Sequence, residues 1–217
     1  MAKPPRAERL FIDGPVGHLE AIVELPADAD PVACVVVCHP HPQHGGTMHN
    51  KVAHTLARAF VRKDFAALRF NFRGTEESDG EFDNAVGELD DALAAIAWMR
   101  QEYPQMSLWL AGFSFGAAIA VKAAVVTELD GLDGLISVAP AISRFASGLE
   151  VQPTCPWLIV QGDQDELVEV EETVEWVDGL EPGPELLIIP DGEHFFHGRL
   201  VELREAVTNF IDDNARI

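Results

Sequence analysis

Runs of apolar and β-branched residues recur along the chain, each bounded by glycine, proline or charged positions. The run Val32–Cys38 contains no charged side chain, which is typical of a strand buried on both faces of a parallel sheet. Longer segments with apolar residues three and four apart lie between such runs, as in amphipathic helices. The expected strands cover residues 32–38, 65–70, 107–111, 134–139, 156–161 and 186–189, with two more inside 8–25 around a turn at Asp13-Gly-Pro15.

The expected helices carry their own signals. Asn50 is placed to cap a helix whose apolar positions are Val52, Leu56 and Phe60. Residues 84–101 predict a second helix. Its broad apolar face is formed by Val86, Leu89, Leu93, Ile96 and Trp98. Further helices are expected over 117–125, 169–180 and 200–211.

Strands that alternate with helices indicate an α/β fold, with a mostly parallel central sheet and helices on both faces. No repeat, low-complexity segment or linker interrupts the pattern. We therefore expect a single domain over residues 1–217.

The segment Gly112-Phe-Ser114-Phe-Gly116 stands between an expected strand and an alanine-rich expected helix. It fits G-x-S-x-G, a sharp strand-to-helix turn that lifts a serine hydroxyl clear of the sheet. Such a turn brings strand and helix so close together that there is no room for a side chain at Gly112 or Gly116. The pattern predicts that Ser114 is a nucleophile. The alternative is an ordinary serine in a βα turn.

A serine hydroxyl becomes a good nucleophile when a base takes its proton, and that base needs an orienting acid. In an open α/β sheet, functional groups gather beyond the carboxyl ends of the strands. The strand over 156–161 is followed by three candidate acids, which are Asp163, Asp165 and Glu166. The strand over 186–189 is followed by two candidate bases, which are His194 and His197. The order along the chain is serine, acid, histidine.

Five motifs carry a family resemblance. They are His39-Pro-His-Pro-Gln-His-Gly-Gly-Thr-Met48, Arg69-Phe-Asn-Phe-Arg-Gly74, Gly112-Phe-Ser-Phe-Gly116, Gly162-Asp-Gln-Asp165 and His194-Phe-Phe-His-Gly198. In these motifs the chain resembles the small, cap-free bacterial α/β hydrolases, a group described mostly as esterases or hydrolases. The resemblance spans residues 39–198. It implies an α/β-hydrolase fold without a cap domain.

By that resemblance Ser114 is the nucleophile, Asp165 the acid and His194 the base. Asp165 fits the family's G-x-x-D position after the strand better than its two acidic neighbours. Asp163 is then expected to hydrogen-bond within its own turn. His197 is the rival base. Its other expected role is a cap or loop contact near the start of the closing helix.

The resemblance also implies two backbone N–H groups that stabilise an oxyanion. One belongs to Phe115, after the nucleophile, and the other to the loop after the strand over 32–38. Two prolines in that loop have no N–H and are excluded. The family position falls on His41, and His39 and Gln43 are the alternatives.

Four histidines, His39, His41, His44 and His49, stand close together in this loop and suggest a metal site. Zinc sites need three or four ligands in fixed geometry, whereas the prolines and a glycine pair suit a shaped loop equally well. We expect no metal. In that interpretation the His39 side chain ties down the loop, and His44 and His49 line or flank the pocket.

Arg69 and Arg73 lie in a segment rich in acidic residues. Structural ion pairs are their expected role, and the alternative is that they bind a substrate carboxylate.

The net charge of the chain limits the kinds of molecule that it is expected to bind. Among 217 residues there are 15 Lys and Arg against 36 Asp and Glu, a net charge of −21. This argues against nucleic acid and anionic membranes, which both require a basic surface.

No leader pattern or membrane-length apolar run is present, so we expect a cytoplasmic protein. Cys34, Cys38 and Cys155 are expected to be reduced, the first two on one face of their strand.

In the family that the chain resembles, caps over large lipophilic substrates follow the sixth strand. Here the segment 140–153 is too short for a multi-helix lid. The expected function is therefore a serine hydrolase that cleaves small-molecule carboxylic esters with short acyl chains through an acyl-enzyme, without a cofactor. The alternatives are a thioesterase, an acyltransferase or a peptidase with the same triad, and a non-catalytic ligand-binding protein on the same fold. No apolar segment indicates a subunit interface.

Overall fold

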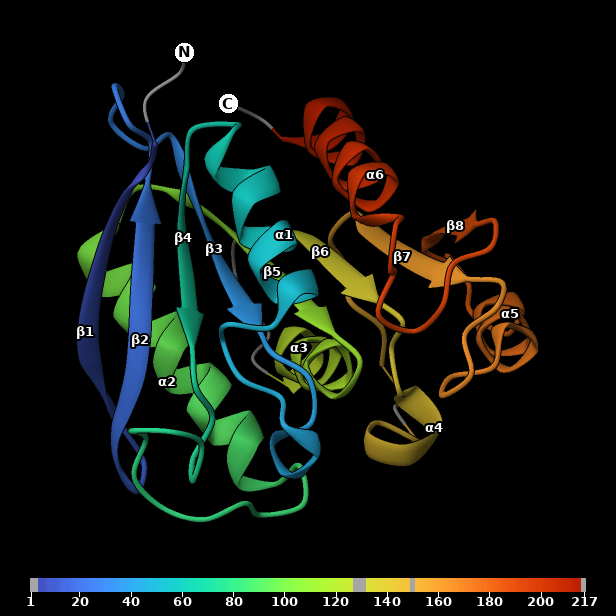
Figure 1. Ribbon diagram of the computed structural model, residues 1–217, viewed down its shortest axis with the longest axis horizontal. Coiled ribbons are helices and arrows are strands. Elements are labelled where there is room, and N and C mark those ends of the chain that lie inside the picture. The colour runs from blue at the N-terminus through green and yellow to red at the C-terminus, as the bar shows by residue number, and fades with distance from the viewer. Residues whose placement is uncertain (1–3, 127–131, 149–150, 216–217) are drawn as a thin grey trace.

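The computed structural model describes residues 4–126, 132–148 and 151–215. Its centre is one sheet with the strand order β1-β2-β4-β3-β5-β6-β7-β8 (Figure 1). β2 pairs antiparallel with β1 and with β4, and all other neighbours are parallel. The strands are β1 (Arg6–Gly14), β2 (Gly17–Leu25), β3 (Ala33–Cys38), β4 (Phe65–Phe70), β5 (Ser107–Phe113), β6 (Leu132–Val138), β7 (Trp157–Gly162) and β8 (Glu185–Ile189). The predicted mostly parallel sheet is confirmed.

Helices cover both faces of the sheet (Figure 1). They are α1 (Lys51–Val61), α2 (Gly87–Glu102), α3 (Phe115–Val126), α4 (Ile142–Phe145), α5 (Val170–Asp178) and α6 (Leu200–Asn214), with a short 3-10 helix η1 (Pro42–His44). α1 and α6 pack on one face, and α2, α3 and α5 pack on the other. The Asn50 side chain caps α1 as predicted, accepting the N–H groups of Val52 and Ala53. Within the described ranges, no helix combines the length and apolarity needed to cross a bilayer.

The side chains of β3 alternate between the two cores. Cys34 and Cys38 lie in the core beneath α2 and α3, whereas Val35 and Val37 lie in the core beneath α1 and α6. The two cysteines therefore share a face, as predicted, and they are free thiols, as is Cys155. Burial raises the pKa of the Cys34 thiol to about 12 and also raises that of Cys38. Both thiols consequently behave as small apolar side chains.

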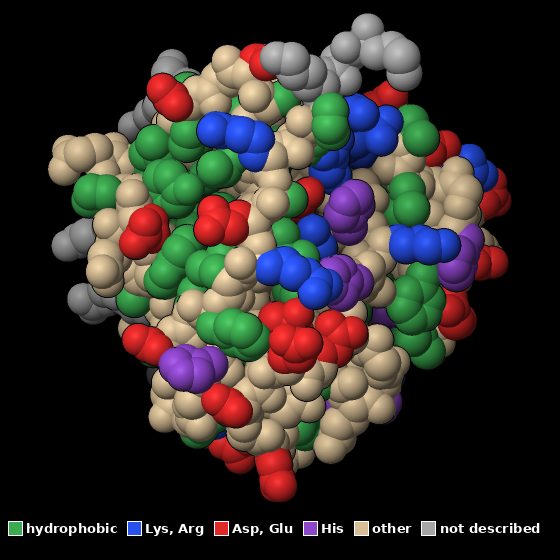
Figure 2. Space-filling view, turned by 60° about the vertical axis from the view of Figure 1, so that its left-hand side comes forward, with side chains coloured by type: hydrophobic (Ala, Val, Ile, Leu, Met, Phe, Trp, Pro, Cys, Tyr) green, Lys and Arg blue, Asp and Glu red, His purple; other side chains and the backbone are tan. Residues whose placement is uncertain are grey.

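Figure 2 shows how the acidic side chains are distributed on one face of the molecule. On the face shown in Figure 2 they lie among polar, basic and apolar side chains and do not merge into one patch. The net charge of −21 is therefore not explained by a single acidic site on that face.

The helix predicted over 84–101 begins later, at Gly87. The Glu88 carboxylate accepts the backbone N–H groups of Asp83 and Ala85, each at 2.7 Å. These bonds hold the preceding residues in a turn, with a φ of +66° at Ala85. A side chain of the first helical turn thus bonds the segment that precedes the helix, and this segment does not continue the helix.

The apolar face predicted for α2 was wrong in part. Val86 is 65% exposed. The buried positions are Gly87, Glu88, Asp91, Ala92, Ala95, Ile96 and Met99. Asp91 is buried because its carboxylate accepts two hydrogen bonds from the Arg73 guanidinium and one from the Arg73 backbone. A Cβ on Gly87 would lie 1.9 Å from that guanidinium, so the ion pair decides which face of the helix packs inward.

Arg69 and Arg73 both form buried ion pairs, as the structural interpretation predicts. Arg69 Nε lies 3.0 Å from a Glu24 carboxylate oxygen, and Arg73 Nη2 lies 2.8 Å from an Asp91 oxygen. Arg69 also donates to the Met48 carbonyl at the end of the histidine-rich loop. Both guanidinium groups are therefore engaged in contacts within the fold.

The turn from β5 to α3 brings two backbones into direct contact. A Cβ on Gly116 would lie 2.3 Å from the carbonyl oxygen of His39 and 2.4 Å from that of Cys38. A Cβ on Gly112 would lie 2.3 Å from the Gly116 carbonyl oxygen. Both glycines are therefore required by the close approach of strand and helix, as the sequence indicates.

His39 ties the loop after β3 to the loop after β4. Its Nδ1–H donates to the Pro40 carbonyl at 2.6 Å, and its Nε2 accepts the Phe72 backbone N–H at 3.0 Å. The residue is completely buried. Burial is the main cause that lowers the pKa of the imidazole from 6.5 to about 4, and the bond to Pro40 opposes it.

Gly116→Ala is expected to lower the free energy of unfolding by about 1–3 kcal/mol, because the new methyl group meets backbone carbonyls that cannot rotate away. Urea denaturation measures the change. Gly179→Ala is the control, since the nearest atom to a Cβ at that position is 3.4 Å away. Equal stabilities of the two variants would contradict the close packing at the turn.

The free energy of unfolding should fall as the pH drops from 6.5 toward 4. In this interval His39 is protonated in the unfolded chain but stays neutral in the folded protein, so protonation favours the unfolded state. At pH near 5 the loss from this group is roughly 2 kcal/mol. In His39→Gln, whose amide does not titrate, the loss over the same interval should be smaller by that amount. Parallel stability curves for the wild type and the variant would exclude a buried neutral imidazole.

Candidate active site

Ser114 occupies the turn between β5 and α3 with a φ of +56°, in the left-handed region. Its N–H donates to the Val138 carbonyl on β6 at 2.8 Å, and its own carbonyl accepts the Ala141 N–H at 3.3 Å. A left-handed non-glycine residue costs on the order of 1–3 kcal/mol and persists only where its surroundings fix it. The side chain remains half-buried, so the hydroxyl is presented at the carboxyl end of the sheet.

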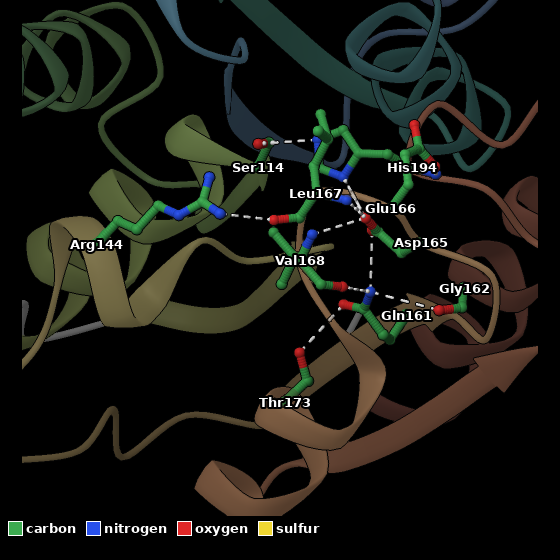
Figure 3. A network of polar contacts seen from close by, with 10 residues as sticks. All are labelled: Ser114, Arg144, Gln161, Gly162, Asp165, Glu166, Leu167, Val168, Thr173 and His194. Atoms are coloured by element: carbon green, nitrogen blue, oxygen red, sulfur yellow. Dashed lines mark hydrogen bonds and ion pairs between the residues drawn. The ribbon is translucent and has the colours of Figure 1, made fainter.

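Three side chains from three strand ends meet at this turn (Figure 3). Ser114 Oγ lies 3.1 Å from His194 Nε2, and His194 Nδ1 lies 2.8 Å from Asp165 Oδ2. A carboxylate can only accept, so Nδ1 carries the proton and Nε2 is the acceptor for the serine hydroxyl. The structure therefore brings together the serine, acid and histidine that the resemblance indicates. The imidazole is in the tautomer that can take a proton from Ser114.

The rival residues lie elsewhere. His197 is exposed and contacts the Glu193 carboxylate at 3.3 Å. Asp163 does not bond its own turn through Oδ1, which is buried without a hydrogen-bond partner among the described residues, and this corrects the expectation. Glu166 accepts the His194 backbone N–H at 3.2 Å and so supports the histidine loop.

Both oxygens of the Asp165 carboxylate accept hydrogen bonds. Its Oδ1 accepts the N–H groups of Leu167 at 2.9 Å and Val168 at 2.8 Å, and its Oδ2 accepts from Gln161 Nε2 at 3.0 Å. Burial raises the pKa of this carboxyl, but the hydrogen bonds from His194, Val168 and Leu167 outweigh burial. The pKa therefore lies below its ordinary value, and the group is a fixed anion beneath the imidazole.

Gln161 is a polar residue of the site that sequence reasoning missed. It is completely buried near the end of β7. Its Nε2 donates to Asp165 Oδ2 and to the Val168 carbonyl at 2.9 Å, and its Oε1 accepts from Thr173 Oγ1 at 3.3 Å (Figure 3). The available signal was a single amide inside the otherwise apolar strand Trp157–Gly162.

Outside the helices and strands, no backbone hydrogen bond among the described residues has the N–H group of His41 or of Phe115 as its donor. The His41 carbonyl accepts the N–H groups of His44 at 3.1 Å and Gly46 at 3.0 Å, which folds the loop into a compact turn. The His41 ring lies 5.0 Å from the Phe115 ring, so the two residues are neighbours. Free amides at such a position are what an oxyanion site requires.

Aromatic rings surround the His41 imidazole. It stacks on His44 at 4.4 Å, and the rings of Phe82, Phe115 and Phe145 lie 4.8, 5.0 and 5.3 Å away. Burial, followed by the neighbouring His44, lowers the pKa of His41. The imidazole is thus held as a neutral ring among aromatic side chains. Phe82 and Phe145 were not identified from the sequence.

The histidine-rich loop does not gather its imidazoles around a common point. His49 lies at the surface, 3.5 Å from Arg9 Nη2 and 3.9 Å from a Glu76 carboxylate oxygen. In the part of the chain that the structure describes, no three His, Cys, Asp or Glu side chains are arranged to hold a metal ion. His44 flanks the site as predicted, whereas His49 does not contact it.

Comparison with known proteins gives the family. The sequence profile of the family Hydrolase_4, described as serine aminopeptidase, S33, matches residues 29–152. An α/β serine hydrolase without a lid, XC6422 from Xanthomonas campestris, is 41% identical and covers 98% of this chain and 97% of its own, with a TM-score of 0.90. An α/β serine hydrolase homologue from Coxiella burnetii is 44% identical over 96% of this chain and 97% of its own, with a TM-score of 0.87.

The uncharacterized protein RP471 from Rickettsia prowazekii is 30% identical over 213 residues, which cover 94% of this chain and 88% of that protein. The match to the family extends over more than half of the chain. The sheet, the left-handed serine turn and the absence of a cap among the described residues agree with it. The protein is therefore a member of the Hydrolase_4 family of serine hydrolases, with an α/β-hydrolase fold and, in the part of the chain that the structure describes, no lid.

Proposed function

We propose that this hydrolase cleaves short-chain carboxylic esters of small molecules through an acyl-enzyme formed on Ser114. The observation that carries the proposal is the unbroken hydrogen-bond chain from Ser114 Oγ through the His194 imidazole to the Asp165 carboxylate. Each member lies within hydrogen-bond distance of the next in the order that proton transfer requires.

In the proposed reaction His194 Nε2 takes the Ser114 proton as Oγ bonds to the ester carbonyl carbon. The Phe115 and His41 N–H groups stabilise the resulting oxyanion. The imidazolium then gives its proton to the alcohol oxygen, the carbon–oxygen bond breaks and the alcohol leaves. Water attacks the acyl-enzyme with His194 again as base, which releases the acid and restores the serine.

Asp165 keeps its charge throughout this cycle. Its pKa lies below the ordinary value, so acidification toward neutral or mildly acidic pH does not neutralise it. The carboxylate orients Nδ1–H and stabilises the transient imidazolium.

The short connection between β6 and β7 supports short acyl chains. α4 has four residues, and the described residues between β6 and β7 form no other helix. A cavity of about 500 Å³ lies beside α4, lined by Ile142, Trp176 and Leu180 among others, but neither Ser114 nor His194 lines it. Among the described residues, no element of this connection other than α4 is available to enclose a long acyl chain at the serine.

A fluorophosphonate is expected to form one adduct on Ser114, with the serine oxygen bonding to phosphorus and fluoride leaving. Intact mass and peptide mapping locate the adduct. Ser114→Ala should give none, and His194→Ala should react at least about 10³-fold more slowly. His197→Ala is the matched control and should label at the wild-type rate. Slow labelling of His197→Ala with normal labelling of His194→Ala would reassign the base.

Esters of 4-nitrophenol with acyl chains of two to four carbons should be hydrolysed with a kcat/KM at least about tenfold above that for ten or more carbons, because no lid buries a long chain. Amide and thioester analogues of the best acyl group test the peptidase and thioesterase alternatives. A preference for long chains would contradict the expectation of an open site for short acyl groups. If the fluorophosphonate labels Ser114 but none of these ester, amide and thioester substrates is hydrolysed, transfer of the acyl group to an acceptor other than water is favoured.

A further inference from the structure

Arg144 lies on α4 at the mouth of the site. The side chain is exposed, and its Nη2 donates to the Leu167 carbonyl at 2.9 Å. No carboxylate in the described part of the chain forms an ion pair with it. The other N–H groups of the guanidinium therefore remain available, and a guanidinium has five in all.

Two contacts fix α4 against the catalytic residues. The Ala141 N–H, at the N-cap of α4, donates to the Ser114 carbonyl. Phe145 packs its ring 4.9 Å from that of Phe115, on the side of the free amides. Arg144, the preceding residue, reaches the loop that carries Asp165 through its hydrogen bond to Leu167, as Figure 3 shows. The segment that carries α4 therefore contacts both the serine turn and the acid loop.

Leu167 connects this cation to the acid of the triad. Its N–H donates to Asp165 Oδ1 and its carbonyl accepts from Arg144, so one residue joins the two. The apolar side chains at this rim are partly exposed, with Leu167 at 44% and Phe195 at 39%. The Phe195 ring lies 5.1 Å from the His194 ring. Leu167, which accepts a hydrogen bond from Arg144, and Phe195, which lies beside His194, therefore both expose apolar surface here.

The other arginines near the catalytic loops are already paired. Arg69 and Arg73 are buried with carboxylates, and Arg199 Nη2 lies 2.9 Å from an Asp191 carboxylate oxygen. Glu166, next to Leu167 in sequence, directs a carboxylate oxygen to the His194 backbone. In a chain of net charge −21, Arg144 is thus an exposed guanidinium that bonds a carbonyl and, among the described residues, no carboxylate. A guanidinium in this state has N–H groups that can bind an external anion.

We propose that Arg144 binds a carboxylate of the substrate, so that the enzyme selects esters that carry a negative charge near the scissile bond. This rests on the proposed esterase function and names its substrate class. The carboxylate can belong to the acyl part or to the alcohol part, and the two cases require different substrates.

The test compares matched pairs of esters. Monomethyl succinate and methyl butyrate share a four-carbon acyl chain, and 4-acetoxybenzoate and 4-acetoxybenzamide share an acetyl group. The measured quantity is the ratio of kcat/KM between the anionic and the neutral ester of each pair. In Arg144→Gln this ratio should fall about 10–100-fold for one pair, mainly through KM, since a hydrogen bond to a charged group is lost. The pair that responds identifies which part carries the carboxylate.

Arg144→Lys keeps the positive charge but loses the paired N–H groups of the guanidinium. Its ratio of kcat/KM should lie between those of the wild type and Arg144→Gln. Arg62→Gln, an exposed arginine at the end of α1, is the control and should leave both ratios unchanged. If the ratios are unchanged in Arg144→Gln while all rates fall together, Arg144 is only a structural contact to Leu167 and the proposal is overturned.

A binding measurement separates this inference from the proposed reaction. Calorimetric titration of Ser114→Ala with monomethyl succinate and 4-acetoxybenzoate requires no turnover. At least one should bind, and about tenfold more weakly once Arg144→Gln is added. Binding that is absent, or equal in both proteins, overturns the carboxylate site. The wild type can fail to hydrolyse any of the four esters while the Arg144→Gln change still weakens binding in the Ser114→Ala background. That outcome would refute the esterase function and support the anion site.

Discussion

The contact between the end of β3 and the start of α3 is the constraint on which the site depends. Because Gly116 has no side chain, the carbonyl oxygens of Cys38 and His39 approach its Cα directly. This places the loop after β3 beside the serine turn, so the free N–H groups of His41 and Phe115 come from neighbouring segments. Ser114 is then held from β6 by Val138. Backbone packing thus creates this half of the site.

The other half is built from side-chain hydrogen bonds. Gln161 and Thr173 link the end of β7 to α5, and Gln161 fixes one oxygen of Asp165 while two backbone N–H groups fix the other. A buried polar network that is satisfied in this way is rigid, because any displacement leaves a polar atom without a partner. The serine is positioned by packing and the imidazole by this network, so the two halves can be perturbed separately.

Much of this arrangement follows from local sequence signals. Alternating strands and helices predict the sheet, and strand ends predict where Ser114, Asp165 and His194 gather, because parallel strands end at a common edge. The start and face of α2 could not be predicted, since they depend on an ion pair with Arg73, which lies in the loop after β4. Arg144 was missed for a similar reason. Its partner Leu167 is 23 residues away in sequence, and no periodicity links them.

The prolines on either side of His41 have a further consequence. Each fixes its own φ and lacks an N–H, and the His41 carbonyl is already bonded to two amides of the same turn. Little conformational freedom is left in this segment for a ligand to remove. The N–H of His41 therefore keeps its direction in the free protein, and the entropy of ordering it is lost during folding and not during binding. The loop is preorganised: its rigidity belongs to the fold and is independent of any substrate.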